Sequence, residues 1–310
     1  MVDNLSIFNF SMKKKIFIIL SIISSLLIAD IVIGNVSKRL ISALPNAGTL
    51  FANNKHALME AKTDLLILGS SRANHHYDTK ILSDSLGLDC YNGGIDGHGM
   101  PMSYCIFKSV IERKKPKIVV LDIWKTMLHD RHMDDLRCFY HLNQYVKEII
   151  DINNTDNLIE KTKYKSNLYL YNSTLPRILQ SYAIGDAVNS GYIASPPKKN
   201  ETLLLRKDTV DFAYDDLCIS LLNEIISDCK KKKILFIIVM SPTLDVQGNN
   251  FIRIAEDISL HHKVAFYNYN DDARFTCHTE FFNDQVHMNR IGAELFSQDL
   301  ANKIMCLLKR

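Results

Sequence analysis

Residues 69–72 (GSSR) follow a short apolar run, and they carry the first side chains that could do chemistry. A serine at a turn from a strand into a helix exposes its hydroxyl, and nearby backbone N–H groups can bind developing negative charge. Ser71 is therefore a candidate nucleophile. Serine is also a preferred residue for capping a helix N-terminus, and this segment alone leaves that alternative open.

Residues 91–99 (YNGGIDGHG) form a second candidate segment, with four glycines. Glycines let backbone amides approach a ligand closely, so such a loop can supply an N–H group to an oxyanion hole. The loop lacks the lysine of a phosphate-binding loop and the glycine spacing of a dinucleotide-binding loop, which argues against nucleotide binding. A plain turn is the alternative.

The third segment places Asp284 three residues before His287, ahead of the last helical stretch of the chain. An aspartate at this spacing can fix the tautomer of the imidazole and stabilise the imidazolium that forms when histidine takes a proton from serine. The D-x-x-H pattern is short, and about one chance match is expected in a chain of this size. A purely structural pair is the alternative.

The elements that must position these segments alternate along the chain. Short, dense apolar runs predict five strands, at residues 64–68, 89–92, 117–123, 234–240 and 264–269. Helical patterns lie between and after them, at residues 78–87, 100–113, 212–230, 248–261 and 289–308. This order predicts an α/β fold, a flavodoxin-like three-layer α/β/α sandwich on a five-stranded parallel sheet. Ligands of such sheets bind beyond the carboxyl ends of the strands, where the candidate segments emerge.

Residues 125–211 interrupt the alternation after the third strand. They are polar, rich in tyrosine and asparagine, and only patchily helical. A structureless loop of this length is improbable in a compact domain, so we expect a small helical cap inserted there.

The N-terminal region predicts a membrane anchor. Three lysines at 13–15 precede an apolar run at 16–34 that, as a helix, would cover about 28 Å. The lysines predict a cytoplasmic segment 1–15, a transmembrane helix 16–34, a linker 35–62 and a main domain 63–310 outside the cytoplasm, periplasmic or extracellular. A cleaved signal peptide and a buried core helix are the alternatives.

Composition excludes some classes of function. A net charge of +3 is too small to indicate nucleic-acid binding. The seven cysteines form no C-x-x-C pair. Ligand spacing on a defined element is also missing from three groups: His75-His76 with Asp78, the segment from His129 through Asp135, and His261-His262. We therefore predict no metal site and no cofactor.

Taken together, the three segments resemble the SGNH (GDSL-type) hydrolase superfamily. ILGSSR looks like its first block, with Ser71 at the nucleophile position and Ser70 replacing the usual aspartate. YNGGIDG looks like the second block and puts Gly97 at the oxyanion glycine, and NDQVHMNRIGAELF looks like the last, implying a triad completed by Asp284 and His287. The resemblance covers residues 63–125 and 212–308 and omits the insertion.

The third block of the family departs from its usual Gly-x-Asn-Asp, because residues 121–124 read LDIW. The resemblance implies an oxyanion hole made by the backbone N–H groups of Ser71 and Gly97, and Asn92 is our candidate for the missing side-chain donor. Envelope-associated branches that act on polysaccharide O-acyl groups also depart from this block, and the chain looks more like those branches than like secreted lipases.

The resemblance implies a serine ester hydrolase or O-acyltransferase acting on acyl esters of cell-envelope polysaccharide or glycolipid, with a membrane acyltransferase as a candidate partner. A catalytically inactive descendant that binds glycan or a partner protein is one alternative, motivated by the missing asparagine. A lipase or thioesterase acting on acyl chains is the other.

Overall fold

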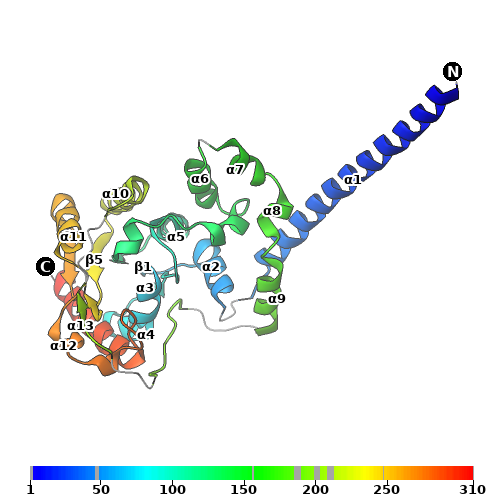
Figure 1. Ribbon diagram of the computed structural model, residues 1–310. Coiled ribbons are helices and arrows are strands. Elements are labelled where there is room, and N and C mark those ends of the chain that lie inside the picture. The colour runs from blue at the N-terminus through cyan, green and yellow to red at the C-terminus, as the bar shows by residue number, and fades with distance from the viewer. Residues whose placement is uncertain are drawn as a thin grey trace.

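The computed structural model describes residues 3–45, 49–155, 157–184, 190–198, 203–207, 213–246 and 248–309. At its centre lies a five-stranded, all-parallel sheet in the order β2-β1-β3-β5-β7 (Figure 1). The strands are β1 (Leu65–Leu68), β2 (Cys90–Asn92), β3 (Ile118–Asp122), β5 (Leu235–Met240) and β7 (Ala265–Asn268). The predicted α/β class and parallel sheet are confirmed, and each strand lies within its predicted run.

The central strands are apolar at nearly every position because both of their faces are buried. Alternate residues point to opposite faces, so Leu66 and Val119 belong to one apolar cluster and Leu65 and Ile118 to another. The register follows, with Leu65 beside Ile118 and Ile118 beside Leu235.

Helices contribute to both clusters. The first cluster contains residues of α2 (Leu50–Met59), α5 (Met100–Arg113), α10 (Asp216–Lys231) and α11 (Asn249–His262). The second contains residues of α3 (Ser71–His76), α4 (Thr79–Leu86) and α13 (Arg290–Leu308). Glycine and asparagine mark two boundaries: Gly87 ends α4 in the left-handed conformation, and the Asn289 side chain accepts hydrogen bonds at the start of α13.

The described part of the insertion between β3 and α10 is mainly helical. It contains η1 (Lys125–Leu128), η2 (Asp134–Phe139), α6 (Gln144–Asn153), α7 (Leu158–Lys163), α8 (Asn167–Tyr171) and α9 (Leu175–Ile184). It also contains a strand that the sequence did not predict, β4 (Arg206–Lys207), which pairs with β6 (Asp245–Val246). Two residues are too few to produce a periodic pattern. Residue 156 and residues 185–189, 199–202 and 208–211 of the predicted cap lie outside the described residues.

The N-terminal helix α1 (Asp3–Ser42) is longer than predicted and runs through the first part of the expected linker. Its segment from Met12 to Ser42 is long and apolar enough to cross a membrane, the single such helix among the described residues. Figure 1 shows α1 projecting from the rest of the molecule, with the N-terminus at its far end.

The insertion packs against the C-terminal part of α1. The Asp30 carboxylate accepts hydrogen bonds from the Ser166 hydroxyl, the Asn167 amide and the Leu168 backbone N–H. Gly34 faces Asn167 so closely that an added Cβ would lie 2.4 Å from its Cγ. Asp30, the one acid of the apolar run, therefore binds the start of α8.

Candidate active site

The turn after β1 places Ser71 at the first position of α3. Gly69 has φ +150°, a conformation that L side chains rarely adopt, and a Cβ there would lie 2.6 Å from that of Ala73. Ser70 occupies the N-cap position but makes no side-chain capping bond. The capping alternative for Ser71 is therefore not what the structure shows.

Ser71, His287 and Asp284 form a continuous hydrogen-bonded array. The Ser71 hydroxyl lies 2.7 Å from His287 Nε2 and donates to it when His287 carries its proton on Nδ1. His287 Nδ1 lies 2.9 Å from Asp284 Oδ2 and 3.0 Å from Oδ1. The three residues that the sequence singled out thus meet with the connectivity of a nucleophile, a base and a residue that orients the base.

The ionised form of Asp284 is held in place by donors around it. Burial opposes ionisation, but hydrogen bonds from the His287 ring and from the Val286 and His287 backbone N–H groups outweigh it and lower the pKa of Asp284 to about 2. Asp284 therefore stays a carboxylate across the physiological range, as an orienting group for imidazole must.

The loop that carries Asp284 and His287 is closed by backbone pairing and anchored by another histidine. Phe282 bridges to Met288, and the Asn283 N–H donates to the His287 carbonyl. The fully buried His76 accepts the Met288 N–H at Nε2, 2.9 Å away, and its Nδ1 lies 2.9 Å from Ser241 Oγ. His76 therefore links α3 to the loop that carries Asp284 and His287. The sequence analysis considered His75 and His76 only as metal ligands, and rejected them.

A buried ion pair lies beside Ser71, the candidate nucleophile. The Arg72 guanidinium is 3.6 Å from Asp122 Oδ2, donates to the Ser241 hydroxyl and backbone carbonyl, and stacks 4.2 Å from the centre of the Trp124 ring. Asp122 Oδ1 accepts from the Tyr77 hydroxyl and the Ser241 N–H. Asp122 stands where the resemblance placed the third block. Through its ion pair with Arg72, this segment contacts α3.

The two candidate oxyanion residues of the glycine-rich loop, Gly97 and Asn92, lie in different surroundings. Gly97 has φ +72° and lines the pocket in front of Ser71. The Asn92 amide is buried, and its NH₂ donates to the carbonyls of Ala73 and Tyr77, 2.7 and 3.2 Å away. Both amide hydrogens are used, so the predicted oxyanion role of Asn92 is not supported. Its side chain instead ties this loop to α3.

Ser71 opens into a pocket of about 220 Å³. The pocket is lined by residues of all three candidate segments, by Trp124 and by the start of the insertion: Ser70, Ser71, Arg72, Gly97, His98, Trp124, Thr126, Asp130, Val286 and His287. Sequence reasoning missed three of these residues: Trp124 ends the divergent third block, and Thr126 and Asp130 lie in the insertion, outside the resemblance. A serine hydroxyl, an imidazole within hydrogen-bond distance of it and a small pocket in front of them could together carry out acyl transfer.

Comparison with family models and with curated proteins gave no match for this chain. The geometry of Ser71, His287 and Asp284 is therefore the ground on which a function can be argued.

Proposed function

We propose that this chain is a membrane-anchored serine ester hydrolase or O-acyltransferase with an SGNH-type α/β/α sandwich. The observation that carries the proposal is the 2.7 Å contact between Ser71 Oγ and His287 Nε2, backed by the 2.9 Å contact from His287 Nδ1 to Asp284. A serine is a weak nucleophile unless a base removes its proton, and this arrangement supplies that base with its orienting carboxylate.

In the proposed reaction, His287 Nε2 takes the Ser71 proton as Oγ attacks the carbonyl carbon of an acyl ester. The tetrahedral intermediate collapses, and the imidazolium returns the proton to the departing alkoxide, which leaves as an alcohol. Water or a second hydroxyl group then attacks the acyl-enzyme with His287 again acting as the base. Asp284 remains ionised throughout and stabilises the imidazolium in both steps.

The backbone N–H groups of Ser71 and Gly97 are the proposed oxyanion donors, because both residues line the pocket that holds the serine hydroxyl. The third donor of related enzymes would come from residues 121–124, and Asp122 there is turned inward to Arg72. The hydroxyl of Thr126, an exposed residue on the pocket wall, is available in this region as a side-chain donor.

The size of the pocket favours a short acyl group. About 220 Å³ is less than the space typical of drug-sized ligands, and a long acyl chain would have to leave it. The helix α1 and the lysines at 13–15 support a domain held outside the cytoplasm at the membrane surface. O-acyl groups of envelope polysaccharide or glycolipid are substrates that are both short and located outside the cytoplasm.

Labelling with a fluorophosphonate probe tests the proposal on the full-length protein in detergent. We expect wild type to be labelled at Ser71, and Ser71→Ala and His287→Ala to lose labelling. Ser70→Ala is the matched control, because Ser70 adjoins the nucleophile and lines the same pocket without contacting His287. It should keep labelling.

A wild type that labels no faster than Ser71→Ala would remove the enzyme proposal and favour an inactive glycan-binding or partner-binding protein. For a labelled enzyme, release of acetate from a short ester is then compared with release of a long acyl chain. Faster release of the long chain would favour the lipase or thioesterase alternative.

A further inference from the structure

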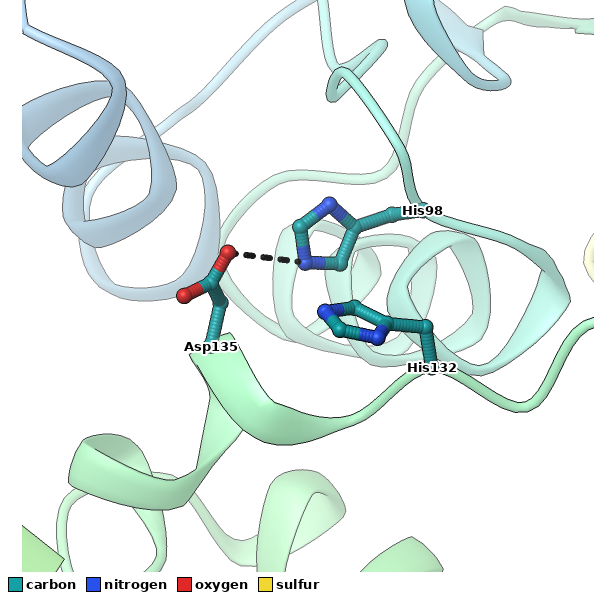
Figure 2. A group of neighbouring side chains, drawn as sticks. All are labelled: His98, His132 and Asp135. Carbon is teal, nitrogen blue, oxygen red and sulfur yellow. Dashed lines mark ion pairs between the residues drawn. The ribbon is translucent and has the colours of Figure 1, made fainter.

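Three side chains beside the active-site pocket lie close enough together to share one ligand. His98 comes from the loop after β2, His132 from the turn between η1 and η2, and Asp135 from η2. One ligand atom from each residue lies within 4.8 Å of the other two. Figure 2 shows the imidazoles of His98 and His132 next to each other, with the Asp135 carboxylate facing His98.

The orientation of His98 leaves one ring nitrogen without a hydrogen bond. Nδ1 lies 2.8 Å from the Asp96 carbonyl oxygen, which can only accept, so Nδ1 carries the proton. In the neutral ring Nε2 then presents a lone pair. His98 is 3% exposed, and its Nε2 is buried without a hydrogen-bond partner among the described residues.

That nitrogen faces the Asp135 carboxylate. Nε2 lies 3.5 Å from Asp135 Oδ2, a poor arrangement for two groups that both offer lone pairs, unless a cation lies between them. The other oxygen, Oδ1, pairs with Arg177, which orients the carboxylate and leaves Oδ2 directed at His98. Metal-binding histidines show this pattern, with the second ring nitrogen donating to a backbone carbonyl and the carboxylate ligand held by a further hydrogen bond.

The separation suits a tetrahedral ion. Ligand bonds of about 2.0–2.1 Å at a tetrahedral centre place neighbouring ligand atoms about 3.4 Å apart. The measured 3.5 Å between Nε2 and Oδ2 meets this requirement without movement. The ring planes of His98 and His132 are inclined at 74° with centres 5.3 Å apart, and the ligand atoms of all three residues lie within 4.8 Å of one another, so a bound ion would draw the His132 ring closer to the other two ligands.

We propose that His98, His132 and Asp135 bind a divalent transition-metal ion, best matched by Zn²⁺, with a fourth position left for water or a ligand. Two imidazoles and one carboxylate are a ligand set that zinc accepts. The site would join the glycine-rich loop to the insertion, next to the oxyanion residue Gly97.

The glycine-rich loop and the first part of the insertion already lie close together, as binding one ion between them requires. A Cβ on Gly99 would lie 2.4 Å from the Asp130 carbonyl oxygen, so glycine is needed for this approach. His98 and Asp130 both line the pocket of Ser71. An ion at this point would stiffen the wall of the pocket without contacting the Ser71 hydroxyl.

Metal binding by the full-length protein in detergent tests the proposal directly. After removal of metal with a chelator, Zn²⁺ is titrated in competition with a chromophoric chelator, and Co²⁺ is used as a spectroscopic substitute. We expect one equivalent of Zn²⁺ bound with micromolar or tighter affinity, and a visible Co²⁺ spectrum typical of tetrahedral coordination. His132→Gln and Asp135→Asn should each weaken Zn²⁺ binding by about 100-fold, because losing a ligand costs at least as much as losing an outer-shell partner.

His278→Gln is the matched control, since His278 forms an exposed histidine–carboxylate pair with Glu280, 2.9 Å apart. It should bind Zn²⁺ like wild type, and circular dichroism checks that every variant is folded. The proposal is overturned if wild type binds less than one equivalent at micromolar Zn²⁺. Unchanged binding in both His132→Gln and Asp135→Asn, or an equal loss in His278→Gln, also overturns it. These readouts do not depend on esterase activity.

Discussion

Replacing Arg72 by methionine should destabilise the domain strongly, because it leaves the buried Asp122 carboxylate without its cation. Asp122 is 0% exposed, and its remaining donors are the Tyr77 hydroxyl and the Ser241 N–H. Removing one partner of a buried ion pair typically costs about 3–5 kcal/mol of unfolding free energy. Methionine keeps apolar contact with the Trp124 ring, so we attribute most of the loss to the uncompensated charge.

The double variant Arg72→Met/Asp122→Asn separates the effect of the uncompensated charge on stability from the effect of losing the packing contacts of the Arg72 side chain. Asp122 Oδ1 accepts both of its hydrogen bonds, and the amide oxygen of an asparagine could accept the same two. The buried charge is then absent. We expect the double variant to be about 2 kcal/mol more stable than Arg72→Met alone, because it no longer buries an uncompensated charge.

The deficit of Arg72→Met should depend on pH. Burial raises the pKa of Asp122, and Arg72 counters this effect in the wild type. Without Arg72 the folded protein holds this proton to higher pH than the unfolded chain, whose aspartate has a pKa of about 3.9. Stability should therefore fall as pH rises above about 4, by up to about 1.4 kcal/mol per pH unit, until the folded pKa is passed. The double variant should lack this dependence.

Urea unfolding in mild detergent measures these free energies, followed by circular dichroism and by the fluorescence of Trp124, the single tryptophan, which contacts Arg72. Arg253→Met, at an exposed arginine of α11, is the control and should change stability by less than about 0.5 kcal/mol. A loss below about 1 kcal/mol for Arg72→Met, or a double variant no more stable than Arg72→Met alone, would refute the reasoning.

Three further outcomes test other parts of the molecule. Asp284→Asn should slow labelling of the nucleophile by about 10⁴-fold with little change in stability, and a rate near wild type would remove the orienting role of the carboxylate. His76→Phe leaves the buried Met288 N–H without its acceptor, so unfolding in urea should show a loss of about 1–3 kcal/mol together with slower labelling; unchanged stability would contradict the anchoring role. Asp30→Ala removes the acceptor of the Leu168 N–H, and limited proteolysis should then cut the insertion faster than in wild type; equal cleavage rates would show that this contact does not hold the insertion on α1.

The sheet was predictable because its central strands are buried on both faces. The predicted strand at 234–240 and the observed Leu235–Met240 differ by one residue, since a run of apolar residues bounded by lysines and by Ser241 permits few other placements. The two-residue strand β4 could not be predicted. It pairs with β6 because the insertion brings the two segments together, and two residues are too few to show an alternating sequence pattern.

The candidate site was partly predictable. Ser71 and the Asp284–His287 pair could be found because each lies in a short segment whose residue types already suit its role. Asn92 was assigned wrongly, because a sequence does not tell whether an amide faces a pocket or, as here, donates to the backbone of α3.

The order of residues within short segments of the sequence was enough to indicate three features. They are a turn that exposes a serine, a carboxylate within reach of an imidazole, and an apolar helix at the N-terminus. Such features depend on residues a few positions apart. The 2.7 Å contact between Ser71 and His287 joins residues 216 positions apart, and the pairing of Arg72 with Asp122 and the meeting of His98 with His132 also cross between elements. These contacts arise when parallel strands bring their carboxyl ends to one edge of a sheet and the insertion packs over it.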